Sequence, residues 1–328
     1  MDKPTVQDIF HRFYPAYLDQ YSPSPVQAKV AHNIMNCKTG AYGANVCVCE
    51  DCGFVQIHYN SCRNRCCPMC QAVPKEMWMD ARREDILDAP YFHLVFTVPD
   101  ILNPVIYSNQ RLLYDALYHA ASSTISELTA DPKRLGAKVG YICILHTWGS
   151  EMNFHPHIHT ILLGGGLASN NQWKDNHYTF KELLDSCYGV DWIPHCKKTF
   201  NGAQTVMKYL GKYTHRIAVS NHRTVRMDDD TVTFLVKDYR NEGQWKELTI
   251  SGVEFVRRFL MHVPPRRFVR IRHYGLLCSR TKSQKLTLCR NLLGCKKYLS
   301  KLRDMEMPEI LEHLYGIKVC ACKACGGH

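Results

Sequence analysis

The chain has 328 residues, of which 45% are hydrophobic and 22% are charged, and its formal net charge is +11. A chain of this size and composition can bury a substantial core and divide into two or three compact units. No apolar run approaches the roughly 20 residues of a membrane span, and the N-terminus lacks the basic and apolar build of a secretory signal. We therefore expect a folded protein without a membrane partner, in the cytoplasm.

The N-terminal part, residues 1–88, is predicted to contain helices followed by a zinc-binding region. Apolar residues recur at helical spacing over the first thirty-odd positions. Eight of the seventeen cysteines then fall within residues 37–70, and this clustering indicates metal binding rather than disulfides. Two Cys-x-x-Cys pairs predict one four-thiolate zinc site, made of Cys49, Cys52, Cys67 and Cys70.

A second zinc ion is predicted from the cysteines and histidines that remain in this region. Its candidate ligands are Cys37, Cys62, Cys66 and His58, with Cys47 and His32 also available. Oxidised cysteine pairs are the alternative to zinc.

The middle part, residues 89–275, begins with alternating predicted strands and helices. A helix is expected over 76–87 and, beyond Pro90, an aromatic and β-branched strand over 91–99. A helical pattern over 109–128 precedes a second strand at 140–148. A third strand runs into three glycines at 164–166, which we interpret as the turn that ends it, because no Lys-Ser or Lys-Thr follows as in a phosphate loop.

The third strand contains the sequence His155-Pro156-His157-Ile158-His159. His157 and His159 occupy alternate positions, so both side chains point from the same face and can hold one divalent cation, Mg²⁺ or Mn²⁺. The preferred third ligand is His146, because its strand is expected to pair with the histidine strand. His155, Glu151 and Gln204 compete with it, and ordinary buried histidines satisfied by hydrogen bonds are the alternative to a metal site.

A helix is predicted over 203–213, with two tyrosines four residues apart on one side. Tyr209 and Tyr213 lie among Lys208, Lys212 and Arg216, without a carboxylate. Neighbouring cations favour the phenolate form of tyrosine, and a metal ion would polarise a phosphodiester nearby. Attack would leave a phosphotyrosine that conserves the bond energy for rejoining. The alternative is that both rings simply pack on the sheet.

Further along, short strands are predicted over 223–227, 231–236 and 245–250. Ser251 and Glu254 then have the spacing of a capping box that opens a helix to Met261. Strands and helices do not alternate strictly, so the sequence predicts an α+β fold with a central antiparallel sheet flanked by helices.

The last part, residues 276–328, is predicted to be a basic segment with a zinc knuckle. Residues 266–303 contain twelve Lys or Arg and no Asp or Glu, which favours a polyanionic partner such as nucleic acid, with Arg270 and Arg272 as candidate contacts. A basic face on an ordinary helical tail is the alternative. Cys322 and Cys325 form half of a metal site that Cys320, His328, Cys289 or Cys295 could complete, unless the tail binds no metal.

Taken together, these motifs resemble the transposases of the IS91 group of rolling-circle insertion sequences, within the HUH endonuclease superfamily. The resemblance rests on residues 60–70, 91–99, 146–149 with 155–159, 209–216 and 269–275. Cys66 departs from it, because many relatives have histidine before the Cys-Pro-x-Cys element.

The resemblance implies an HUH nuclease core that nicks and rejoins single-stranded DNA at transposon ends and targets. The metal would be bound by His157 and His159, and Tyr209 or Tyr213 would form a 5′-phosphotyrosine link. A zinc-dependent DNA-binding protein without catalysis, and a replication initiator or relaxase, are the rival functions. The oligomeric state is left open.

Overall fold

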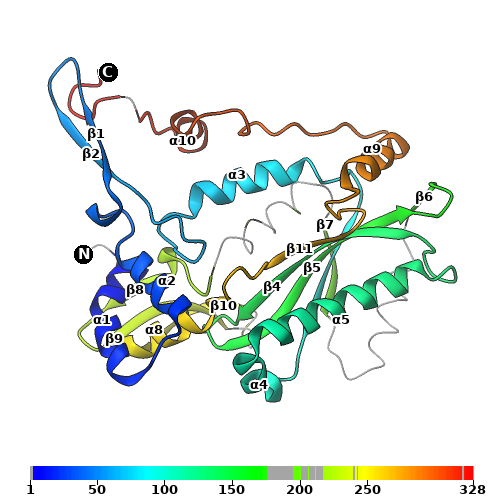
Figure 1. The fold of residues 1–328 in the computed structure, drawn as a ribbon, viewed down its shortest axis with the longest axis horizontal. Helices are drawn as coiled ribbons and strands as arrows, with labels where there is room; N and C mark the ends of the chain where they lie inside the picture. Colours follow the sequence, from blue (N-terminus) through cyan, green and yellow to red (C-terminus); the bar gives the residue numbers. More distant parts are fainter. Residues whose placement is uncertain are drawn as a thin grey trace.

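A computed structural model describes residues 3–175, 217–238, 241, 243–319 and 321–327, the backbone of 195–200, and the isolated positions 206 and 211. The fold is α+β with antiparallel sheets and helices, as the sequence predicts. Helices α3 and α9 lie above the central sheet and α5 below it, while α1, α2 and α8 gather at one end (Figure 1). Within the described residues, no helix is long and apolar enough to span a membrane.

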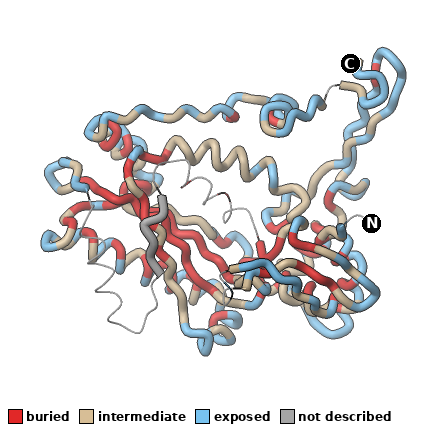
Figure 2. The backbone as a smooth tube through the Cα atoms, turned by 180° about the vertical axis from the view of Figure 1, so that it is seen from behind, coloured by how far each residue is buried: buried red, intermediate tan, exposed pale blue. Residues whose placement is uncertain are grey.

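The central sheet has six strands and carries the histidines. Its strands are paired in the order β11-β4-β5-β3-β7, and β6 pairs with β5 outside this path. The bounds are β3 (Tyr91–Thr97), β4 (Lys138–Trp148), β5 (Phe154–Leu167), β6 (Trp173–Asp175), β7 (His195–Phe200) and β11 (Ile271–Gly275). Figure 2 shows a long continuous run of buried residues along β4 and β5, at the centre of the sheet.

The two faces of this sheet bury different cores, because successive side chains of a strand point to opposite sides. Helix α5 (Gln110–Ala130), preceded by α4 (Asn103–Ser108), packs with Tyr118 and its neighbours against Cys143 and Leu162. The opposite face buries Ile144 and Ile161 together with residues of α3 (Ala72–Arg83) and α9 (Lys282–Leu293). His146, His157 and His159 lie in register with this second face.

The predicted strands at 91–99 and 140–148 and their helices are confirmed, but two details differ. The helix expected over 76–87 begins at Ala72, because Pro74 is tolerated in a first helical turn. The glycines at 164–166 do not form a turn; they continue β5. A Cβ on Gly166 would lie 2.6 Å from the carbonyl oxygen of Lys138, and one on Gly164 would lie 2.8 Å from that of Pro90. Only glycine permits this close strand packing.

A second body forms at the end of the sheet from both early and late parts of the chain. Helices α1 (Val6–Gln20), α2 (Pro25–Met35) and α8 (Gly252–Met261) share a core with the sheet of β8 (Thr224–Met227), β9 (Thr231–Asp238) and β10 (Gln244–Ser251). Thr5 and Asp8 cap the start of α1 reciprocally. Phe10 of α1 meets Phe259 of α8 edge to face. This core therefore draws on residues on both sides of the boundary expected after residue 88.

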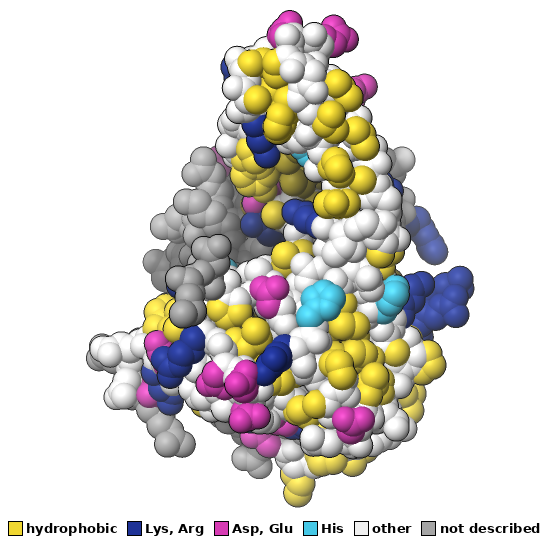
Figure 3. Space-filling model, turned by 90° about the vertical axis from the view of Figure 1, so that its left-hand side faces the viewer, with side chains coloured by type: hydrophobic (Ala, Val, Ile, Leu, Met, Phe, Trp, Pro, Cys, Tyr) yellow, Lys and Arg dark blue, Asp and Glu magenta, His cyan; other side chains and the backbone are white. Residues whose placement is uncertain are grey.

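A hairpin of β1 (Ala44–Val48) and β2 (Val55–Tyr59) projects from this second body (Figure 1). Hydrophobic side chains, including the exposed Val46, Val55 and Ile57, cover the projection, and the surface is hollowed below it (Figure 3). After α9 the chain crosses above α3, forms α10 (Met307–Tyr315) and ends beside the hairpin tip. We call residues 294–327 the C-terminal strap.

The C-terminal strap is held along α3 by polar contacts. Tyr298 and Ser300 donate hydrogen bonds to Asp80, and Arg303 forms an ion pair with Glu84. Lys282 of α9 pairs with Asp85 in the same way. Part of the positive charge of residues 266–303 is thus neutralised by carboxylates of residues 80–85. Less positive charge is therefore available to a polyanion than the sequence of this segment alone suggests.

Candidate metal centres

Three histidines converge on one face of the central sheet. His146 on β4 lies directly opposite His157 on β5, and His159 lies two residues further along β5. Their side chains are 2%, 9% and 9% exposed, and one ring nitrogen from each lies within 4.8 Å of the other two. The predicted pairing of the two strands is confirmed. Among the competitors, His155 and Glu151 are not in this group, and Gln204 lies outside the described residues.

Hydrogen bonds orient two of the three rings. The Nδ1 atom of His157 lies 2.7 Å from the carbonyl oxygen of His155; a carbonyl only accepts, so Nδ1 carries the proton and Nε2 keeps its lone pair. The Nδ1 atom of His159 lies 2.9 Å from Nε2 of His93 on β3. If Nδ1 donates to His93, the Nε2 atom of His159 carries the lone pair that a metal would bind. No role for His93 is predicted from the sequence, although it lies on the predicted strand 91–99.

The separation of the Nε2 atoms of His157 and His159 suits adjacent ligands of one ion. The Nε2 atoms of His157 and His159 are 3.0 Å apart. Two nitrogens each about 2.1 Å from a metal and at right angles would be about 3.0 Å apart. Burial lowers the pKa of His157 to about 4 and that of His159 well below its usual value. Both imidazoles are consequently neutral at neutral pH, which is the form that binds metal.

Aromatic and cationic side chains flank the histidine cluster. The ring of Trp148 stacks on His146 with 4.6 Å between centroids, and the guanidinium of Arg270 lies over Trp148 at 5.7 Å. Arg272 instead forms an ion pair with Asp115 and lies 4.0 Å over the ring of Tyr118. The predicted DNA contacts are Lys208, Lys212, Arg216, Arg270 and Arg272, of which the last two lie in the described residues. Arg270 stacks on the histidine cluster through Trp148, whereas Arg272 already serves the packing of α5.

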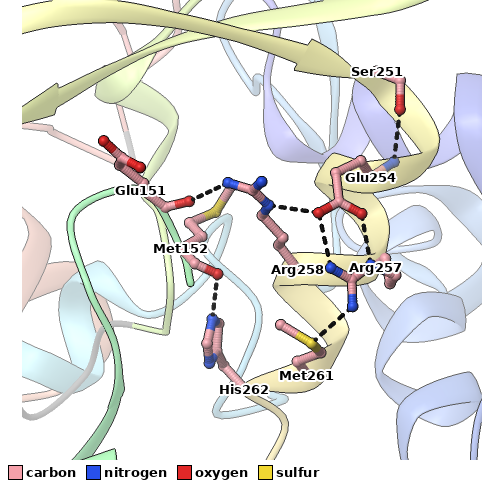
Figure 4. Close-up of polar contacts among 8 residues, drawn as sticks. All are labelled: Glu151, Met152, Ser251, Glu254, Arg257, Arg258, Met261 and His262. Atoms are coloured by element: carbon pink, nitrogen blue, oxygen red, sulfur yellow. Dashed lines mark hydrogen bonds and ion pairs between the residues drawn. The ribbon is translucent and has the colours of Figure 1, made fainter. Parts of the chain in front are cut away.

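The turn between β4 and β5 is fixed by the neighbouring body. Arg223 donates to the carbonyl of Ser150 at 2.6 Å. Figure 4 shows Arg258 donating to the carbonyl of Glu151 and His262 hydrogen-bonded to that of Met152. Glu254, whose pKa is lowered to about 2 chiefly by its hydrogen bonds from Arg257, also holds Arg258 in place. These contacts set the register that brings His146 opposite His157.

His262 gives this region a dependence on pH. Its Nε2 donates to Met152 and its Nδ1 faces the hydroxyl of Thr147 at 3.1 Å, and burial lowers its pKa from 6.5 to about 4. Because the unfolded chain binds a proton at His262 below about pH 6.5 and the folded protein only below about pH 4, the stability is complete above pH 6.5 and falls as the pH drops towards 4. We expect His262→Gln to remove about 2 kcal/mol of the stability difference between pH 7 and pH 4.5. Urea unfolding of both proteins at the two pH values measures this, and equal pH dependence would contradict it.

The predicted tyrosines and their flanking cations, Tyr209, Tyr213, Lys208, Lys212 and Arg216, lie outside the described residues. Two described positions bracket Tyr209. Val206 is fully buried in the core on the histidine face, and a Cβ on Gly211 would lie 2.1 Å from the sulfur of Met79 on α3. The chain therefore passes at both positions on the side of the sheet that carries the histidines.

The cysteines form two clusters whose membership differs from the predicted one. Cys37, Cys62, Cys67 and Cys70 form the first, and Cys49, Cys52, Cys322 and Cys325 form the second. The prediction that Cys49 and Cys52 join Cys67 and Cys70 is wrong. Cys37 and Cys62 flank the base of the β1–β2 hairpin, whereas Cys49 and Cys52 lie at its tip. Strands of five residues separate base from tip by about 17 Å, too far for one ion.

The first cluster has the contacts of a structural zinc site. The sulfurs of Cys62 and Cys70 are 3.8 Å apart, and backbone amides of Cys62 and Asn64 point to the sulfurs of Cys37 and Cys62. Cys66 and His58, expected among the ligands of a second zinc, belong to neither cluster. The Cys66 thiol is buried, which raises its pKa to about 11, and it feels the charges of Arg270 and Arg65. Cys66 thus packs in the core of the second body, with the charges of Arg270 and Arg65 nearby.

Comparisons with known proteins agree with these features. Residues 9–98 match the family model described as "Transposase zinc-binding domain", and residues 140–181 and 174–285 match the one described as "Putative transposase". No solved structure matches the chain. The fold and sites thus belong to a transposase with an N-terminal zinc-binding domain.

The relatives specify the family more narrowly. "Putative transposase y4qJ" of Sinorhizobium fredii is 36% identical, with 98% of this chain and 93% of the relative covered. "Transposase for insertion sequence element IS801" of Pseudomonas savastanoi pv. phaseolicola is 28% identical, with 80% and 72% covered. The chain belongs to the IS91 family of transposases. Its substrate is accordingly DNA, and structural zinc is supported by the family match and the cysteine clusters.

Proposed function

We propose that this transposase cuts and rejoins single-stranded DNA through a covalent 5′-phosphotyrosine intermediate, as in rolling-circle transposition. The observation that carries the proposal is the group of His146, His157 and His159 on the buried face of an antiparallel sheet. Val206 and Gly211, the described positions on either side of Tyr209 in the sequence, lie on the same side of that sheet. This combination supports an HUH nuclease core, with residues 1–88 as the zinc-binding part, 89–275 as the nuclease and 276–328 as the basic C-terminal part.

The three histidines fit a divalent cation. The imidazoles of His157 and His159 are neutral because burial lowers their pKa values, and hydrogen bonds to His155 and His93 can direct their Nε2 atoms to one point. Nitrogen donors suit Mn²⁺ or another transition metal better than Mg²⁺, which prefers oxygen ligands. When bound, the cation polarises the scissile phosphate and neutralises the charge that develops on it. We therefore expect Mn²⁺ to support the reaction better than Mg²⁺.

The nucleophile in this proposal is the phenol oxygen of Tyr209 or Tyr213. Tyrosine has an ordinary pKa of about 10, so the cations Lys208, Lys212 and Arg216 serve to favour its phenolate. Attack on phosphorus forms the phosphotyrosine bond and breaks the bond to the 3′ oxygen, which leaves as a free hydroxyl. Attack by a 3′ hydroxyl of another strand reverses the step and restores tyrosine.

The DNA itself would be held by cations near the histidines. Arg270 is suited to a phosphate because it lies beside Trp148, which stacks on His146. Trp148 also offers an aromatic face of the kind on which unpaired bases stack. Arg272 contributes indirectly, since its ion pair with Asp115 secures α5.

A denaturing-gel assay with single-stranded oligonucleotides from both ends of the element tests the proposal. With Mn²⁺, we expect a protease-sensitive protein–DNA adduct that EDTA prevents. Tyr209→Phe combined with Tyr213→Phe should remove the adduct completely while leaving DNA binding within about threefold, because the phenol oxygen forms the covalent bond and the rings remain. The single variants distinguish an essential tyrosine from a dispensable one.

Three outcomes would refute the proposal. An adduct that persists in the double variant would show that another residue is the nucleophile. Tight binding to both ends without any adduct would favour a zinc-dependent DNA-binding protein that has no catalytic activity. Cleavage confined to a plasmid-type origin sequence would favour a replication initiator or relaxase.

A further inference from the structure

The two Cys-x-x-Cys turns of the second cluster are built alike, although they lie at opposite ends of the chain. In the hairpin turn, the amide of Cys49 bonds to the carbonyl of Phe54 and the amide of Gly53 to the carbonyl of Cys49. In the strap turn, the amide of Cys322 bonds to the carbonyl of Gly327 and the amide of Gly326 to that of Cys322. The spacing of donor and acceptor is the same in both turns.

The positions after each pair of cysteines correspond as well. Gly53 and Gly326 have φ values of 71° and 76°, in the left-handed region where glycine carries no steric penalty. Beyond each glycine, a backbone amide bonds to the sulfur of the second cysteine: that of Phe54 to Cys52, and that of Gly327 to Cys325 at 3.4 Å. Each turn therefore presents two sulfurs in the same way, with amides that stabilise negative charge on them.

The sulfur separations match zinc coordination and exclude disulfides. Cys49 and Cys325 have sulfurs 3.6 Å apart, and those of Cys52 and Cys322 are 3.7 Å apart. Four sulfurs arranged tetrahedrally at about 2.3 Å from zinc are about 3.8 Å from one another, whereas a disulfide requires about 2.05 Å. All four ligand atoms lie within 4.8 Å of one another.

We propose that a second zinc ion bound by Cys49, Cys52, Cys322 and Cys325 clasps the C-terminal strap to the tip of the N-terminal hairpin. Four thiolates in tetrahedral geometry select zinc over the oxygen-preferring cations. Cys322 and Cys325 lie beyond both matched regions, which end at residues 98 and 285. The clasp therefore joins the zinc-binding domain of the family, which contains Cys49 and Cys52, to the other end of the chain.

The clasp would hold the end of the strap where its described hydrophobic residues are poorly buried. Beyond α10, Ile317 is 52% exposed and Lys318 is exposed, and on the strap before it Leu299 is 69% exposed. The tip of the hairpin is also poorly buried, since Val48 and Val55 there are 60% and 54% exposed. Each half of the site thus lies on a weakly packed segment, and the metal would hold the two segments together where the chain end lies beside the hairpin tip (Figure 1).

The deciding experiment is native mass spectrometry of the full-length protein, purified with reductant, to count zinc ions per chain. Two cysteine clusters predict two zinc ions in the unaltered protein and one after Cys322→Ser with Cys325→Ser. Cys49→Ser with Cys52→Ser should also leave one, because each pair supplies half of the site. The matched control is Cys47→Ser with Cys295→Ser, one cysteine from the hairpin and one from the strap, which should retain two.

Limited proteolysis with trypsin provides a second measurement that depends on the clasp. We expect cleavage at Lys318 to be at least tenfold faster in the strap-cysteine variant than in the unaltered protein and the control. One zinc ion in the unaltered protein, or two retained in the strap-cysteine variant, would overturn the proposal. A second metal identified as iron, or a disulfide between the two turns, would overturn it as well.

Discussion

Replacing His157 with alanine is expected to lower the rate of DNA cleavage by about 10³-fold or more, because the loss of a metal ligand forfeits several kcal/mol of charge stabilisation in the transition state. His157 is buried directly opposite His146, with its Nε2 3.0 Å from that of His159, and no described neighbour can take its place in the group. Titration calorimetry with Mn²⁺ should show binding in the unaltered protein and none in the variant, and single-turnover cleavage should fall in parallel.

Two further histidine variants give this prediction its controls. His155→Ala, two residues earlier on the same strand, should keep cleavage within about threefold, since only the backbone carbonyl of His155 bonds to His157. His93→Ala removes the partner of His159 and should weaken Mn²⁺ binding by about 10- to 100-fold, as is usual for groups that orient a ligand. Cleavage by His157→Ala at the rate of His155→Ala would contradict the assignment of the metal site.

The second large effect concerns Cys67, which belongs to the cluster at the hairpin base. We expect Cys67→Ser to release that zinc ion and to unfold the body formed by α1, α2, α8 and β8–β10, because Cys67 is fully buried in its core. Zinc binding in small zinc folds is worth about 10–16 kcal/mol, which is comparable with the whole stability of a typical domain. Zinc content and the cooperativity of urea unfolding measure the result.

The neighbouring cysteine provides a matched control for this prediction. Cys66→Ser alters a thiol that is also buried but belongs to neither cluster, so it should keep all of its zinc and lose no more than about 1–3 kcal/mol for the buried hydroxyl. Loss of zinc from Cys66→Ser together with retention in Cys67→Ser would show that the ligands have been assigned wrongly. Because the same body anchors the turn between β4 and β5, Cys67→Ser should also impair the histidine site.

The histidine site could be predicted from the sequence because it depends on local rules. Alternation along a strand places His157 and His159 on one face, and pairing of consecutive strands brings His146 opposite. The partner of His159 could not be predicted, since β3 reaches β5 from far along the chain and its register with β5 is set by the fold. The one sequence feature that pointed to this partner was His93, a histidine on the predicted strand 91–99.

The cysteine pairing could not be predicted for a similar reason. Spacing identifies Cys49 with Cys52 and Cys67 with Cys70 as local pairs, but it does not say which pairs meet. A hairpin of residues 44–48 and 55–59 would have placed Cys49 and Cys52 at its tip, far from Cys67 and Cys70 near its base. The pattern Cys-x-x-Cys-Gly, shared by residues 49–53 and 322–326, would then have linked Cys49 to Cys322. The prediction that glycines 164–166 form a turn was wrong, because glycine permits close strand packing as readily as a turn.

The most direct test of the central claim is to map the covalent adduct by tandem mass spectrometry. The protein would be reacted with a single-stranded oligonucleotide from its own element in Mn²⁺, digested with protease and nuclease, and searched for peptides carrying a nucleotide. We expect the modification on Tyr209 or Tyr213, in a reaction that EDTA or His157→Ala abolishes. A nucleotide on a residue other than these tyrosines, or an adduct that forms without metal, would contradict the account.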